Sequence, residues 1–234
     1  MTVEVREYYD AYWRAREEPR TEARSRERAA LVLALLGPPG PDARLVDLGC
    51  GPGWGLDVFR DAGWTVAGVD ASVVAVEAAR ARGIPARQLD LERDALEGLG
   101  SLTGGAPEVF VALEVLEHLV DPSGFLSRLQ TVVGRDGRLI VSLPNEIHVL
   151  ARLRILFGRL PFGGHRDPHL RHFDLRQARR LFSESGYRVR GERAVPLAPP
   201  RWTLLRLVSA PLVRLLPGLF SIGSIYELEA DGSR

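Results

Sequence analysis

The stretch Val46-Asp47-Leu48-Gly49-Cys50-Gly51-Pro52-Gly53 decides the fold of this chain of 234 residues. It follows a short apolar run, so an acidic residue leads from a predicted strand directly into a glycine-rich turn. Glycine has no Cβ, and such a turn therefore brings backbone N–H groups close to a ligand. A dinucleotide site would hold a pyrophosphate there, next to which Asp47 would be unfavourable. The stretch favours a ligand with positive charge beside Asp47.

Strands and helices alternate on both sides of this turn. Strands are expected at 44–48, 65–69, 86–89, 109–113, 138–143, 187–193 and 224–229, and helices at 55–62, 72–82, 122–133 and 174–184. The last of these helices begins with Asp174 and has Gln177 three residues later, which is a capping-box pattern. The alternation predicts an α/β fold, a doubly wound Rossmann-like sheet that is mostly parallel with an antiparallel last strand.

Segments outside this alternation divide the chain. Residues 1–36 are expected to be helical, and the main domain covers residues 37–234 after a proline- and glycine-rich linker. Two stretches near 145–172 and 195–220 are apolar and interrupted by arginine. The first is too long for an ordinary connection. From their sequence, both could form a helical cap over a bound ligand, lie on a membrane surface or form a homodimer interface.

Composition limits the classes of partner and the compartment. The formal net charge is +1 and the hydrophobic share 45%, which argues against a dedicated nucleic-acid binder. Cys50 is the only cysteine, so we expect a reducing, cytoplasmic setting, with membrane association left open. The chain has no lysine, which we attribute to the base composition of a bacterial genome rich in G and C.

Polar residues also follow the other predicted strands. Gly68-Val69-Asp70, Leu89-Asp90 and Glu114-Val115-Leu116-Glu117-His118-Leu119 come after the glycine turn in that order. Together with the turn, they resemble the class I S-adenosylmethionine-dependent methyltransferases from about residue 40 to 145. The last motif is similar to the branch that contains the ubiquinone-biosynthesis O-methyltransferases.

The resemblance implies a set of cofactor-binding positions. Asp47 would face the methionine ammonium, Asp70 the ribose hydroxyls and Asp90 the adenine amine. Residues 1–36 would form a helical lid whose aromatic residues cover the sulfonium, and the stretches near 145–172 and 195–220 would form a cap over the acceptor. Arg24 or Arg28 would pair with the methionine carboxylate. The complete expected set is Tyr8, Trp13, Asp47, Gly49, Gly51, Gly53, Asp70, Ala71, Asp90, Leu91, Leu113 and Glu114.

Histidines carry the expected chemistry. A hydroxyl acceptor must lose a proton, and a neutral imidazole can take it, so His118 and His169 are the candidate bases. Glu114, Glu117, His118 and a later histidine, for which we select His169, also resemble the magnesium set of small-RNA 2′-O-methyltransferases. His165 and His172 are the other candidates for that place. Magnesium prefers oxygen ligands, so we favour the metal-free role.

These observations predict an S-adenosylmethionine-dependent O-methyltransferase. Its acceptor is expected to be a small, partly apolar molecule, such as a secondary metabolite, a quinone precursor, or a glycosylated or lipid-linked compound. N- or C-methylation by the same scaffold is the alternative. An NAD(P)-dependent oxidoreductase would need Gly-x-Gly-x-x-Gly, whereas this chain has Gly49-x-Gly51-x-Gly53. A non-catalytic scaffold would be expected to have lost Asp70 or the glycines.

Overall fold

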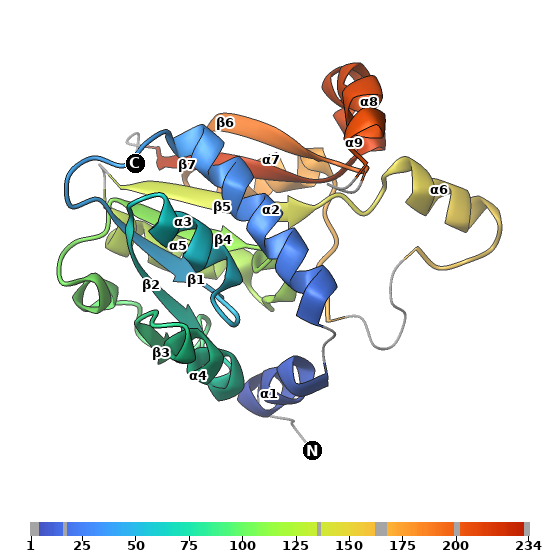
Figure 1. Ribbon diagram of the computed structural model, residues 1–234. Helices are drawn as coiled ribbons and strands as arrows, with labels where there is room; N and C mark the ends of the chain where they lie inside the picture. Colours follow the sequence, from blue (N-terminus) through green and yellow to red (C-terminus); the bar gives the residue numbers. More distant parts are fainter. Residues whose placement is uncertain (1–4, 16–17, 135–136, 162–167, 199–201, 232–234) are drawn as a thin grey trace.

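The computed structural model describes residues 5–15, 18–134, 137–161, 168–198 and 202–231. Its elements follow the expected alternation closely (Figure 1). In chain order they are α1 (Val5–Ala15), α2 (Glu18–Leu36), β1 (Arg44–Leu48), α3 (Trp54–Asp61), β2 (Thr65–Asp70), α4 (Val73–Ala81), β3 (Ala86–Gln88), a 3-10 turn (Leu99–Thr103), β4 (Val109–Leu113), a second 3-10 turn (Leu116–His118), α5 (Pro122–Val133), β5 (Arg138–Pro144), α6 (Val149–Leu156), α7 (Leu175–Glu184), β6 (Tyr187–Pro196), α8 (Thr203–Leu215), α9 (Pro217–Phe220) and β7 (Ser221–Ala230).

A seven-stranded sheet with the order β3-β2-β1-β4-β5-β7-β6 forms the centre of the molecule. The strands from β3 to β5 pair in parallel, and β7 pairs antiparallel with both β5 and β6. The predicted fold class, with its antiparallel last strand, is therefore confirmed. Because parallel strands run in the same direction, the residues that follow β1, β2, β4 and β5 meet at one edge of the sheet.

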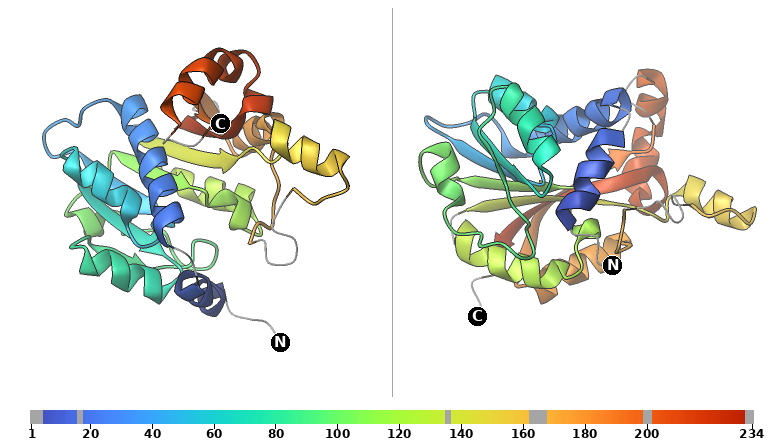
Figure 2. Two further views of the ribbon diagram at one scale, coloured as in Figure 1. Left: turned by 45° about the vertical axis from the view of Figure 1, so that its right-hand side comes forward. Right: turned by 90° about the horizontal axis from the view of Figure 1, so that it is seen from below.

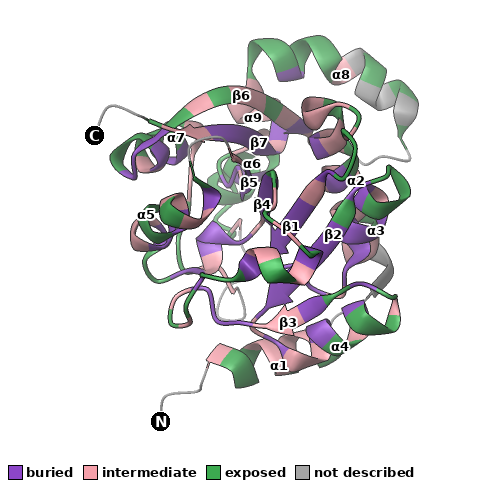
Figure 3. Ribbon diagram, turned by 90° about the vertical axis from the view of Figure 1, so that its left-hand side faces the viewer, coloured by how far each residue is buried: buried purple, intermediate pink, exposed green. Residues whose placement is uncertain are grey.

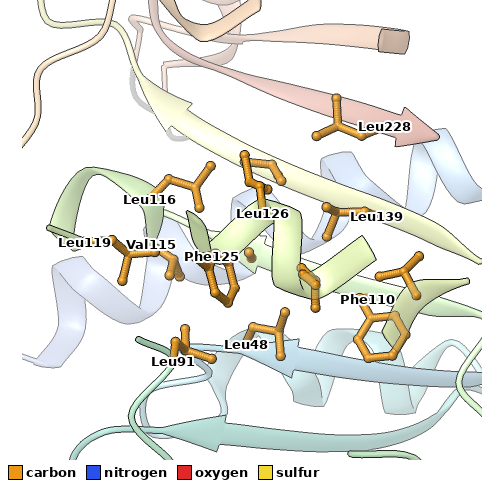
Figure 4. Close-up of a cluster of buried hydrophobic side chains, with 14 of the residues drawn as sticks. Leu48, Leu91, Phe110, Val115, Leu116, Leu119, Phe125, Leu126, Leu139 and Leu228 are labelled. Atoms are coloured by element: carbon orange, nitrogen blue, oxygen red, sulfur yellow. The ribbon is translucent and has the colours of Figure 1, made fainter. Parts of the chain in front are cut away.

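Helices cover both faces of the sheet (Figure 2). Helices α2, α3 and α4 lie on one face, and α5 and α7 lie on the other. Side chains of β1 alternate accordingly, because successive residues of a strand point to opposite faces. Leu45 belongs to one buried cluster with Phe59 of α3. Leu48 belongs to the other with Phe125 of α5, and Figure 4 shows this second cluster. The central strands are buried along almost their whole length (Figure 3).

The predicted start of α7 is confirmed in detail. The Asp174 side chain accepts hydrogen bonds from the N–H groups of Arg176 and Gln177, each at 2.8 Å. The Gln177 side chain in turn accepts from the Asp174 N–H at 3.1 Å, which completes a capping box. Two of the N–H groups that lack a partner within the helix are thereby satisfied.

The two apolar stretches contain helices, as expected. Helix α6 follows β5, and α8 with α9 connects β6 to β7, so all of them leave the same end of the sheet (Figure 1). Many of their apolar side chains are exposed. None of the helices in the described part of the chain is long and apolar enough to cross a membrane.

Candidate active site

The glycine turn after β1 has the geometry expected from its sequence. Gly49, Gly51 and Gly53 adopt φ angles of +82°, +53° and +82°, a region in which side chains are strained and glycine is not. The N–H groups of Gly49 and Cys50 donate to the Val69 carbonyl of β2, at 2.8 and 2.9 Å. The turn is thus held against the end of β2, where the next acidic residue lies.

Asp70 ends β2 beneath the turn. Its Oδ2 accepts a hydrogen bond from the Gly51 N–H, and its Oδ1 accepts one from the Ser72 N–H, both at 2.9 Å. Burial raises the pKa of Asp70 to about 6, and these two N–H groups oppose the shift. Because a carboxylate oxygen accepts more than one hydrogen bond, Asp70 can still receive bonds from a pair of hydroxyls.

Asp47 is the unsatisfied acid of this region. Its side chain is buried, with 5% exposed, and its Oδ1 has no hydrogen-bond partner among the described residues. Burial raises the pKa of Asp47 to about 7, and the nearby charge of Asp70 adds to the shift. A buried carboxylate without a partner is costly, so the position suits a ligand that brings a cationic or hydrogen-bonding group.

Asp90 follows β3, which pairs with β2 so that Asp70 is opposite Gln88. Asp90 is buried, and its Oδ1 accepts from the Glu92 N–H at 3.0 Å. Leu91 is buried beside it, in the core cluster of Figure 4. The two acids therefore lie after neighbouring strands at the same edge of the sheet, as the prediction for ribose and adenine requires.

Helix α1 lies over the glycine turn. Asp10 fixes it to the start of α4, because its carboxylate accepts from the Ser72 hydroxyl at 2.5 Å and from the Val74 N–H at 3.3 Å. The indole of Trp13 covers Gly51 so closely that a Cβ built on this glycine would come within 2.8 Å of the ring. The predicted lid position of residues 1–36 is consistent with this contact for α1.

The aromatic residues of α1 differ in what they face. Tyr8 is 41% exposed, whereas Tyr9 lies between Tyr8 and the ring of His118, whose centroid is 6.1 Å away. Burial raises the pKa of Tyr9, and the neighbouring Tyr8 adds to the shift. The role of Tyr8 in cofactor binding stays a prediction, and Tyr9 is an α1 aromatic in ring contact with His118.

Glu114 follows β4 in a strained conformation, with φ at +58°. The Ser142 hydroxyl holds it on both sides, accepting from the Glu114 N–H at 2.9 Å and donating to Glu114 Oε1 at 2.8 Å. Arg28 of α2 pairs with Glu114 Oε2 at 2.6 Å. Arg24 pairs with Glu27 at 3.0 Å. Both arginines expected at the methionine carboxylate are therefore bound to acids here.

Glu117, His118 and His169 come together at this edge, with ligand atoms within 4.8 Å of one another. Glu117 is fully buried, and neither of its carboxylate oxygens has a hydrogen-bond partner in the described ranges. Burial raises its pKa well above the usual value, and Glu114 contributes further. His118 Nδ1 lies 3.1 Å from the Pro168 carbonyl, which can only accept, so Nδ1 carries the proton and Nε2 the basic lone pair.

Glu146 bridges the other two histidines of the site. Its Oε1 lies 2.7 Å from His169 Nδ1, and its Oε2 contacts His172 Nδ1. A carboxylate that accepts from Nδ1 fixes the tautomer and leaves Nε2 as the basic nitrogen. The rings of His118 and His169 are 4.9 Å apart, so the two candidate bases act in one place. His165 lies outside the described residues.

A cavity of about 210 Å³ adjoins this cluster. Glu146 and His169 line it, together with His148 at the start of α6, Pro161, and Ile222 of β7. Burial lowers the pKa of His148, which disfavours a protonated imidazole beside the cavity. The cavity is thus lined by one candidate base, His169, and by residues at the start of α6 and of β7, where the two apolar insertions join the sheet.

Sequence reasoning missed Tyr9, Ser142 and Glu146. Glu146 had a usable signal, because it follows a predicted strand as Asp70 and Glu114 do. Ser142 had none, since it points toward the site from within β5 and meets Glu114 only through the pairing of β5 with β4. Of the four residues considered for a metal, three converge, while Glu114 is taken by Arg28 and Ser142.

Comparisons with known proteins agree with this geometry. The family model described as a methyltransferase domain matches residues 20–192. Among curated relatives, the ubiquinone biosynthesis O-methyltransferase of Ralstonia nicotianae is 33% identical over 114 residues, which is 48% of this chain and 47% of that protein. The enzyme of the same name from Xanthomonas axonopodis is 28% identical over 120 residues, 51% of this chain and 49% of that protein.

The chain spans about half the length of these curated relatives. Among solved structures, the magnesium protoporphyrin IX methyltransferase of Synechocystis with bound S-adenosylhomocysteine superposes with a TM-score of 0.59 at 19% identity. That match covers 98% of this chain and 89% of the other. At this identity the likeness concerns the fold, and it extends over almost the whole chain.

Proposed function

The chain belongs to the methyltransferase-domain family, and we propose that it transfers the methyl group of S-adenosylmethionine to a hydroxyl oxygen of a small, partly apolar acceptor. The observation that carries the proposal is the unpartnered Oδ1 of buried Asp47 beside the glycine turn. A methionine ammonium would satisfy this carboxylate. A pyrophosphate would place a second negative charge beside it, which argues against the oxidoreductase alternative.

The remaining acids provide places for the rest of the cofactor. Asp70 would accept the ribose hydroxyls, and Asp90 with the Leu91 N–H would hold the adenine. Trp13 covers the turn and would lie near the sulfonium, where an aromatic face is favourable for a cation. Leu113 and Glu114 would form the opposite wall at the end of β4.

The cofactor supplies a methyl group on a positively charged sulfur, which departs as a neutral thioether. The protein's contribution is to place the acceptor oxygen in line with that methyl group and to remove the acceptor's proton. His118 and His169 carry basic lone pairs at Nε2, because Pro168 and Glu146 hold their Nδ1 protons. Glu146 is therefore a positioning residue for His169, and its charge stabilises the imidazolium that proton uptake creates.

The cavity beside His169 and Glu146 supports a small acceptor. Its volume of about 210 Å³ and its apolar lining from Ala151, Pro161 and Ile222 suit a compact ring with an apolar substituent. An acceptor hydroxyl in this cavity would lie next to the candidate bases. N- or C-methylation stays the alternative, because the same cavity would admit an amine or an activated carbon.

A metal at the histidines is a second candidate, favoured by the two unpartnered oxygens of buried Glu117. Glu117, His118 and His169 would hold it, and Glu146 would orient His169 from behind, as carboxylates do at metal sites. A donor set of one carboxylate and two imidazoles suits zinc or manganese better than magnesium. Such an ion would supply charge to lower the pKa of an acceptor hydroxyl.

The cofactor assignment is tested by titration calorimetry with S-adenosylhomocysteine. We expect Asp70→Ala to weaken binding about 10- to 100-fold, because hydrogen bonds to a charged group are lost. Asp61→Ala is the matched control, since Asp61 is an exposed acid at the end of α3. Equal affinity in wild type and Asp70→Ala would overturn the ribose assignment.

The acceptor is tested by transfer of an isotopically labelled methyl group to a panel of phenols, catechols, amines and enols. Mass spectrometry of the products locates the methyl group on oxygen, nitrogen or carbon. We expect O-methylated products. Labelled amines or carbons alone would replace the proposal with its alternative, and bound cofactor without transfer to any class would favour a scaffold.

A further inference from the structure

Helices α6 and α8 are brought to the same side of the molecule by the topology of the sheet. β5 leads into α6, and β6 leads into α8, while β7 lies between these two strands. Both helices consequently leave the end of the sheet at which β5 and β6 finish (Figures 1 and 2). We call the exposed residues that the structure describes within 150–160 and 202–216 the α6/α8 surface.

The α6/α8 surface exposes large apolar side chains. Leu156 is 75% exposed and Phe157 76% on the α6 side, and Leu204 is 77% and Leu207 69% exposed on α8. Figure 3 shows α8 standing away from the buried centre of the molecule with mostly exposed residues. Scattered single leucines would need no explanation, but two helices with this character at the same end of the sheet mark a contact surface.

The charges of this surface all have the same sign. No aspartate or glutamate stands between Glu146 and Asp167, or between Glu192 and Glu227, although the chain has 30 acidic residues. Arg154, Arg159 and Arg214 are exposed, and none of them pairs with a carboxylate of the described residues. Several arginines of the main body do pair with acids, for example Arg179 with Glu192 at 2.5 Å.

This combination selects one kind of partner. A second copy bound through the same surface would place arginines against arginines with no acid to separate them, which is unfavourable. A bilayer of anionic lipids accepts both components, because leucines and aromatic rings enter the acyl boundary while arginine heads stay at the phosphates. We propose that the α6/α8 surface docks this protein on an anionic lipid bilayer.

The location of the cavity gives this docking a consequence. His148 and Ala151 at the start of α6 and Ile222 at the start of β7 line the cavity, so it lies at the root of the α6/α8 surface. A docked molecule would therefore take an acceptor that is dissolved in the bilayer. That consequence rests on the proposed function, whereas the docking itself does not.

The test is co-sedimentation of the full chain with vesicles. One set consists of phosphatidylcholine alone, and a second contains phosphatidylglycerol as a minor component. We expect binding to the second set only, weakened by salt. Each arginine near an anionic surface changes the partition coefficient onto the vesicles about fivefold. The partition coefficient of the triple variant Arg154→Glu, Arg159→Glu, Arg214→Glu should therefore fall at least about a hundredfold. Leu156→Gln with Leu207→Gln should also weaken binding.

The matched control is Arg176→Glu, Arg180→Glu, Arg188→Glu, which makes the same change of net charge on α7 and β6. It should keep vesicle binding. Thermal unfolding of every variant checks the fold, and cofactor titration checks the proposed function separately. Absence of binding to anionic vesicles, or an equal loss in the control, would overturn the proposal. Self-association that the surface variants abolish, without vesicle binding, would assign the surface to a second copy instead.

Discussion

The two sides of this molecule offer different physical means of contact to a ligand. Around the glycine turn, acids with fixed backbone partners mark each position, as Asp70 does with the N–H groups of Gly51 and Ser72. Around α6 and α8, the surface is apolar and arginine-rich. Hydrogen bonds specify direction and distance, whereas apolar contact specifies little beyond area. The sequence of the first side therefore predicts one particular ligand, whereas the sequence of the second side predicts only a class of partner.

The largest effect is expected at the boundary between the two sides. His118→Ala and His169→Ala should each lower kcat about 10²- to 10⁴-fold, because a positioned general base is lost. Affinity for S-adenosylhomocysteine should change little. Glu146→Gln should lower kcat less and shift its pH profile, since the substitution keeps the shape of the side chain but removes the charge behind His169. Unchanged kcat in both histidine variants would remove them as bases.

A chelator distinguishes the two proposed roles of His118 and His169, as bases or as metal ligands. If they act as bases without a metal, kcat should be insensitive to the chelator. Loss of activity on chelation, with recovery on adding zinc or manganese, would instead support the metal candidate at Glu117, His118 and His169.

The contrast in packing predicts the next effect, on the free energy of unfolding. Leu48 is fully buried at the end of β1, so Leu48→Ala should cost about 2–5 kcal/mol. Leu156 on α6 is 75% exposed, and Leu156→Ala should change stability by less than about 0.5 kcal/mol. Urea denaturation measures both. A comparable loss at Leu156 would mean that α6 is packed in solution, and the contrast between the two sides would fail.

The smallest of these effects concerns pH. Asp47 has a pKa of about 7 in the folded protein, above its ordinary value of 3.8. The folded state therefore binds more protons than the unfolded state between these values, and stability falls as pH rises through that window. The free energy of unfolding of Asp47→Asn should fall less over this pH range, and the difference from wild type in this fall should reach about 2 kcal/mol or more at pH 8. Denaturation at several pH values measures it, and an equally steep fall in the variant would contradict the assignment.

Binding of a cationic ligand should reverse that cost. An ammonium beside Asp47 favours the charged carboxylate, so cofactor binding near pH 6 should release a proton. Calorimetry in buffers of different ionisation enthalpy detects this release, and Asp47→Asn should abolish most of it.

Most of the sheet could be predicted from sequence because its signals are local. An apolar run, a glycine and an acid within about ten residues define each strand end, and the capping box of Asp174 and Gln177 lies within one turn of helix. The parallel core follows from alternation alone, and the structure confirms it.

The connections within the site could not be predicted, because they join residues far apart in the sequence. Arg28 binds Glu114, which is 86 positions away in the sequence. Arg28 is one of the two arginines expected at the cofactor carboxylate, and Glu114 occupies it here. Glu146 meets His169 across 23 positions. Tyr9 and Tyr8 are adjacent on a helix, so their sequence gives no reason to choose between them, and only the docking of α1 brings Tyr9 next to His118.

The contact of α1 with the glycine turn has an optical consequence. The indoles of Trp13 and Trp54 lie with their centroids 5.9 Å apart and their planes at 71°, one on α1 and one on α3. Two chromophores so close and so inclined couple their excited states, and separation of the helices would uncouple them. The protein thus contains its own spectroscopic gauge of the position of α1, readable in the near-ultraviolet without any attached dye.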